Sequence, residues 1–149
     1  MRDQALRLLE EAAVAHLGLI SKGRPYVTPM SFVVDGERVL FRTKPGKKLE
    51  AIKENPEVCI EASRFDEETG WWASVIVMGT ARESHDADTE QLTVELLFEK
   101  YSKSLGSPLS RDGLQPLPGF PHVIEVKIEE VTGMSSGGGL RARTRPGRL

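Results

Sequence analysis

The chain has 149 residues, of which 39% are hydrophobic and 28% charged, a composition typical of one globular domain with a real core. The formal net charge of −2 excludes a global positive field that would recruit nucleic acid or an anionic membrane. The single cysteine, Cys59, excludes an intrachain disulfide, and no apolar run approaches the ~20 residues that span a bilayer. Because residues 1–16 mix acids and amides with short apolar steps, we expect no signal peptide and a cytoplasmic location.

The hydrophobic pattern predicts helices and strands in a mixed order along the chain. The helices are expected over residues 3–13, 48–55 and 87–102, and the strands over 16–21, 26–34, 38–43, 57–63, 72–82 and 122–131. The strand at 72–82 is apolar on both faces through its middle, which favours a central strand covered on both sides. Since the strands dominate and follow one another through mostly short turns, the sequence predicts a small antiparallel barrel with added helices.

Two residues interrupt the predicted strands. Pro29 gives no ladder donor, so it marks an edge, a bulge or a place where backbone groups are left for a ligand. Gly79 indicates a bulge or a close approach of another backbone.

A basic cluster opens the second helix. Arg42, Lys44, Lys47 and Lys48 lie within seven residues, and Thr43 adds a hydroxyl group. A helix start offers free backbone N–H groups and the positive end of the helix dipole, so a phosphate is the natural ligand there. Charge alone is equally consistent with a solvated, lysine-rich loop.

No catalytic constellation is evident in the remaining sequence. The three histidines have no metal-ligand spacing, and a hydrolase elbow, a Walker loop and a GxGxxG motif are absent, so we expect no metal site and assign no catalytic residue. Cys59 fits a small buried hydrophobe better than a reactive thiol. Trp71 and Trp72 point to opposite faces of a strand, so one of them could stack on a ring or an interface, or both could simply pack.

Residues 135–149 differ in composition from the rest, with glycines followed by arginines. We expect a flexible basic tail that is disordered or contacts a partner, without specific nucleic-acid binding. The sequence is therefore divided into a domain at 1–134 and a Gly/Arg-rich tail at 135–149.

The order of short motifs between residues 14 and 134 resembles the flavin-binding split-barrel family related to pyridoxamine 5′-phosphate oxidase. The resemblance is strongest to the branch of small flavin nucleotide-binding proteins that includes nitroimidazole-resistance proteins. The motifs in order are Gly23-Arg24-Pro25, the strand with Pro29, Asp35-Gly36, Phe41-Arg42-Thr43, the GKK of 46–48, the NPEV of 55–58, the strand at 72–82 and the VTGM of 131–134.

This resemblance implies a six-stranded antiparallel split β-barrel that forms a homodimer with FMN at the interface. It implies that Lys47 and Lys48 hold the FMN phosphate, with Arg42 and Thr43 beside them. The backbone of Thr28, Pro29, Met30 and Ser31 would lie along the flavin ring. Ser74 would reach the cofactor from the partner chain, with Trp72 stacking nearby.

The chain also departs from the oxidase pattern. Thr28 replaces the arginine that the oxidases carry at the start of the ring-binding strand, and their C-terminal substrate-binding arginine and histidine have no match. We therefore expect an FMN-binding flavoprotein, an oxidoreductase on a small molecule, but not a true pyridoxamine phosphate oxidase. The alternatives are a deazaflavin coenzyme, for which the arginines between 141 and 148 would suit an acidic tail, a haem-binding protein, and a non-catalytic flavin carrier or sensor.

Overall fold

The computed structural model describes residues 2–104, 121–136, 147 and 148. The helices are α1 (Arg2–Glu11), α2 (Lys47–Glu54) and α3 (Ala87–Ser104). The strands are β1 (Ala15–Ser21), β2 (Arg24–Met30), β3 (Val33–Asp35), β4 (Arg38–Thr43), β5 (Glu57–Phe65), β6 (Trp72–Glu83), β7 (His122–Ser135) and β8 (Gly147–Arg148). All of them join one antiparallel sheet in the order β2-β1-β5-β6-β7-β4-β3, with β8 beside β7.

The expected antiparallel split barrel is confirmed, but the expected number of strands is wrong. The segment 26–34, predicted as one strand, is divided into β2 and β3 by Ser31 and Phe32. The β1–β2 ladder ends at the pair Ala15–Met30. Beyond it, the Phe32 N–H donates to the hydroxyl of Tyr101 in α3 at 3.0 Å. A side chain from α3 thus replaces the ladder partner of the broken strand, and the described residues contain seven main strands and the two-residue β8.

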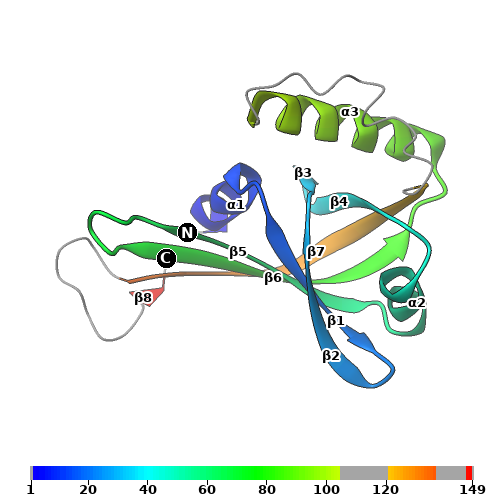
Figure 1. The fold of residues 1–149 in the computed structure, drawn as a ribbon, viewed down its shortest axis with the longest axis horizontal. Helices are drawn as coiled ribbons and strands as arrows, with labels where there is room; N and C mark the ends of the chain where they lie inside the picture. The colour runs from blue at the N-terminus through cyan, green and yellow to red at the C-terminus, as the bar shows by residue number, and fades with distance from the viewer. Residues whose placement is uncertain (1, 105–120, 137–146, 149) are drawn as a thin grey trace.

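The curled sheet has a helix on each of two sides (Figure 1). On the inner side, α1 buries Ala5, Leu8 and Leu9 in the main core, which also takes the inward side chains of the long strands. On the other side, α3 packs over β3 and β4, where Leu97 and Tyr101 form a second buried cluster with Val33 and Leu40. In the described part of the chain, no helix combines the length and the apolar composition needed to cross a membrane.

The expectation that the strand at 72–82 is covered on both sides is wrong for the single chain. Burial alternates along β6, and on its outer face Ile76 and Met78 are 36% and 47% exposed. The strand buried on both faces is β4, where Val39, Leu40 and Phe41 are buried in succession. The difference arises because α3 covers the outer face of β4, whereas Ile76 and Met78 meet solvent.

The expected bulge at Gly79 is confirmed. The β6–β7 register shifts between Met78 and Gly79, and a Cβ at Gly79 would lie 2.3 Å from the carbonyl oxygen of Lys127. Of the tail expected at 135–149, residues 137–146 and 149 lie outside the described residues. Ser135 still belongs to β7, and the backbone of Gly147–Arg148 pairs with it as β8.

Candidate functional site

The start of α2 has the backbone geometry of an anion site. Gly46 caps the helix with φ 148°, a conformation that favours glycine, and no side chain caps the first turn. The first backbone N–H groups of a helix have no partner within the helix. These groups and the helix dipole together favour a negatively charged ligand beside Lys47 and Lys48.

Three of the expected phosphate-binding residues come together where β4 leads into α2. The Lys48 ammonium lies 5.6 Å from the centre of the Phe41 ring, and burial lowers the pKa of Lys48. Burial also lowers the pKa of Arg42. Thr43 is buried and donates its hydroxyl to the Lys44 carbonyl at 3.2 Å. Because desolvation disfavours these two positive charges, a bound anion would restore what burial removes.

Lys47 lies on a different side of the same helix start. Its ammonium is 4.3 Å from the centre of the Tyr26 ring in β2. It also lines a small cavity of about 250 Å³ with Ser21, Lys22 and Glu50. The structure therefore directs Lys48 toward β4 and Lys47 toward β2.

The expected ring-binding residues follow Tyr26 along β2. Four residues separate Tyr26 from Met30, which is roughly 13 Å of strand. Met30 is buried, whereas Pro29 and Ser31 are exposed, and Ser31 lies in the break between β2 and β3. Thr28 donates its hydroxyl to the Pro29 carbonyl at 3.5 Å. One strand thus connects the ring under Lys47 to a stretch of backbone outside the ladder.

Trp72 and Ser74 are not brought to these residues within one chain. Ser74 pairs with Ser63 and Met134, near the beginning of β6. Thr43 pairs with His122, whose neighbours on β7 pair with Glu83 at the other end of β6. Nine residues from Ser74 to Glu83 correspond to roughly 30 Å of strand. The expected contribution of Trp72 and Ser74 therefore requires a second copy of the chain.

Sequence reasoning missed a charged group beside Thr43. His122, the register partner of Thr43, donates a hydrogen bond to Glu83, and Lys53 of α2 lies 3.8 Å from the same carboxylate. The hydrogen bond from His122 lowers the pKa of Glu83. These residues are far apart in the chain, so no local motif signals them. Within the described ranges, no group of three or more His, Cys, Asp or Glu residues is placed to hold a metal ion.

The sheet order and the helix positions define a split-barrel protein. The chain belongs to the pyridoxamine 5′-phosphate oxidase family, because the family model with that description matches residues 1–135.

Solved structures share the fold at low sequence identity. A FAD-binding protein from Mesorhizobium loti is 22% identical, with 89% of this chain and 91% of that chain covered and a TM-score of 0.69. A candidate 5-nitroimidazole antibiotic resistance protein from Bacteroides thetaiotaomicron is 20% identical, with 91% and 84% covered and a TM-score of 0.73. The heme storage protein HutZ from Vibrio cholerae is 18% identical, with 88% and 94% covered and a TM-score of 0.67.

Proposed function

We propose that this chain is an FMN-binding flavoprotein and acts as an oxidoreductase on a small molecule. The observation that carries the proposal is the uncapped start of α2, with the half-buried cations Arg42 and Lys48 beside it. From that start, β2 leads to the exposed backbone at Ser31. A phosphate at one end and a flat ring at the other suit this arrangement.

The protein's part in the chemistry is binding and orientation. A bound flavin supplies the redox chemistry itself. Lys48 and Arg42 would bind the phosphate, Thr43 would hold the start of the loop, and Lys47 would cover the approach along Tyr26. The backbone of Thr28–Ser31 would hold the edge of the ring, where N–H groups stabilise negative charge.

The proposed cofactor site is shared by two copies of the chain. Ile76 and Met78 present an apolar outer face on β6, and exposed apolar patches of this kind suit a protein partner. A second copy on this face would bring its Trp72 and Ser74 to the cofactor, which one chain alone cannot do. The homodimer is therefore part of the proposal.

Pyridoxamine phosphate oxidase activity is not proposed, because Thr28 stands where the oxidases carry an arginine. Two other cofactors have support from relatives. The Mesorhizobium loti neighbour is described as FAD-binding, and the Vibrio cholerae neighbour as a heme storage protein. A deazaflavin coenzyme and a non-catalytic flavin carrier also use the same fold.

The test is the visible absorption spectrum of the purified protein, followed by heat release and identification of the chromophore. Released FMN supports the proposal, whereas FAD, a deazaflavin or haem would replace the cofactor. A colourless protein is titrated with FMN and with riboflavin, which lacks the phosphate. Tighter binding of FMN than of riboflavin is expected, and failure to bind either would overturn the flavin assignment. Reduction of bound FMN by a nicotinamide or another donor, with reoxidation by a small molecule, distinguishes an oxidoreductase from a carrier.

A further inference from the structure

The break between β2 and β3 is held by two adjacent side chains of α3. Phe32, the residue after the expected ring-binding segment, is fully buried and has both of its backbone polar groups bound by that helix. Tyr101 and Lys100 make these contacts, and we call the two residues the α3 clamp.

Tyr101 fixes the break through one buried hydroxyl group. This oxygen accepts the Phe32 N–H at 3.0 Å and donates to the Ala13 carbonyl at 2.8 Å. It also hydrogen-bonds with the side chain of Ser31, and burial raises the pKa of Tyr101. The hydroxyl thereby joins the end of β2 to the turn before β1.

Lys100 binds the other side of the same peptide unit. Its ammonium donates to the Phe32 carbonyl at 3.1 Å and lies 3.7 Å from the centre of the Phe32 ring. Burial lowers the pKa of Lys100 to about 8, opposed by Glu10 of α1, which favours the charged form. Tyr101 is the other titratable group beside it, at 5.3 Å from its ring centre.

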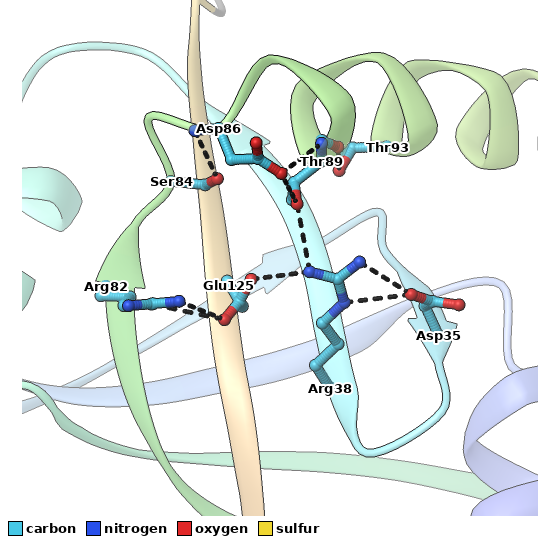
Figure 2. Close-up of polar contacts among 8 residues, drawn as sticks. All are labelled: Asp35, Arg38, Arg82, Ser84, Asp86, Thr89, Thr93 and Glu125. Atoms are coloured by element: carbon cyan, nitrogen blue, oxygen red, sulfur yellow. Dashed lines mark hydrogen bonds and ion pairs between the residues drawn. The ribbon is translucent and has the colours of Figure 1, made fainter.

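The helix that carries the clamp is anchored at its other end. Figure 2 shows Arg38 of β4 reaching Thr89 in the first turn of α3, with Nη1 to Oγ1 at 3.2 Å. Asp86 accepts the Thr89 N–H at 3.1 Å and caps the helix. With its first turn attached to β4, α3 sets where Lys100 and Tyr101 meet the break.

We propose that Tyr101 and Lys100 are positioning residues that hold the Ser31–Phe32 backbone in the geometry in which it meets the flavin ring. The inference rests on the proposed function, because it assigns the break to the ring of the cofactor. Without the clamp, the ladder ends at Met30 and the following N–H and C=O groups have no fixed direction. With it, the peptide next to the ring segment is preorganised before the cofactor binds, which reduces the ordering that binding requires.

The charge of Lys100 connects the clamp to pH. A charged donor makes a stronger hydrogen bond to the Phe32 carbonyl than a neutral amine does. FMN is an anion, so it binds more tightly when Lys100 carries its proton. Affinity for FMN should therefore fall as the pH rises through about 8.

The test uses the full chain with Tyr101→Phe, Lys100→Met and Lys100→Arg, and with Lys127→Met on exposed β7 as a control for lost charge. FMN affinity is measured by fluorescence titration on both sides of the pKa of about 8. Amide hydrogen exchange at Phe32 is measured in the protein freed of cofactor. Tyr101→Phe removes the acceptor of a buried N–H group, so we expect faster exchange and roughly fivefold weaker FMN binding or more.

Lys100→Met should weaken FMN binding and abolish the fall near pH 8. Lys100→Arg keeps the charge and the donor, so it should retain affinity and also lose the fall, while Lys127→Met should behave like the wild type. Unchanged affinity and unchanged pH profiles in the Lys100 variants, or faster exchange in Tyr101→Phe without weaker binding, would overturn the clamp. If the wild type binds no FMN, the proposed function fails and the assignment of the clamp to a flavin fails with it, whatever the exchange rates.

Discussion

Arg38 and Glu125 form the closest ion pair between β4 and β7 that Figure 2 shows, with Nη1 and Oε2 2.8 Å apart. The Glu125 side chain is 14% exposed, and Arg82 approaches its other oxygen at 3.1 Å with 76% of the Arg82 side chain exposed. Arg38 also binds Asp35 through two nitrogens. Burial opposes the charge of Arg38, but its hydrogen bonds to Asp35 and Glu125 prevail and raise its pKa.

The two arginines should therefore contribute unequally to stability. Arg38→Met leaves Asp35 and a mostly buried Glu125 without their main partner, so it should lower the free energy of unfolding by about 1–3 kcal/mol. Arg82→Met removes an exposed partner and should lower it by less than ~1 kcal/mol. Urea denaturation of both variants measures the difference. Equal losses would show that the geometry around Glu125 does not set the energy.

Lys48 should determine the affinity for FMN through the phosphate. Loss of one charge-assisted hydrogen bond predicts about tenfold or weaker FMN binding for Lys48→Ala, with riboflavin binding unchanged. Lys53→Ala is the matched control, since Lys53 lies in the last turn of the same helix and pairs with Glu83. Fluorescence titration of both ligands measures the effect. Equal loss of FMN and riboflavin in Lys48→Ala would contradict a phosphate contact.

Local sequence patterns predicted most of the secondary structure. The alternation at 38–43 gave β4 with its observed bounds, and the basic run before the helical spacing placed the start of α2 within one residue. The break after Met30 could not be predicted in this way. It depends on Tyr101, which lies 69 residues from Phe32 and which the helical spacing assigns only to an apolar stripe.

The candidate site was predictable only in part for the same reason. Arg42, Thr43 and Lys48 are neighbours in sequence, so their proximity follows from one turn between a strand and a helix. His122 and Glu83 meet only through the sheet order, since 39 residues separate them. The apolar pattern of β6 likewise does not say whether a helix of the same chain or a second copy covers its outer face.

Gly79→Ala should destabilise the fold more than Gly18→Ala. The new Cβ at Gly79 would lie 2.3 Å from the Lys127 carbonyl oxygen, and the backbone of β7 would have to shift. We expect a loss of about 1–3 kcal/mol, as for overpacking in general. At Gly18 the nearest atom is the Cys59 Sγ at 2.6 Å, on a side chain that can rotate away, so the loss should be smaller. Thermal denaturation measures both, and a larger loss for Gly18→Ala would refute the assignment of strain to the bulge.

Lys100 should give the free energy of unfolding a characteristic dependence on pH. Its pKa is about 8 in the folded protein and 10.5 ordinarily. Between these values the unfolded chain binds more protons at this site than the folded one, so the contribution of Lys100 to stability increases as the pH rises. It is constant below pH 8 and above pH 10.5.

The measurement compares wild type with Lys100→Met by urea denaturation across this range. The difference in unfolding free energy should shift toward the wild type from pH 8 upward. A constant difference would mean that Lys100 keeps its ordinary pKa.

Met78→Glu should separate the proposed dimer. The side chain lies 47% exposed on the outer face of β6, in a row across the sheet with Cys59, Gly18 and the exposed Val27. A buried carboxylate at a dimer interface is strongly unfavourable, so the variant should become monomeric while its thermal stability as a monomer stays near that of the wild-type monomer. Because Trp72 and Ser74 lie roughly 30 Å of strand from the phosphate-binding end, the monomer should also lose FMN affinity. Gln91→Glu on the exposed side of α3 is the control and should leave both unchanged. Light scattering with an FMN titration gives the answer, and a monomeric Met78→Glu protein with full FMN affinity would place the whole cofactor site within one chain.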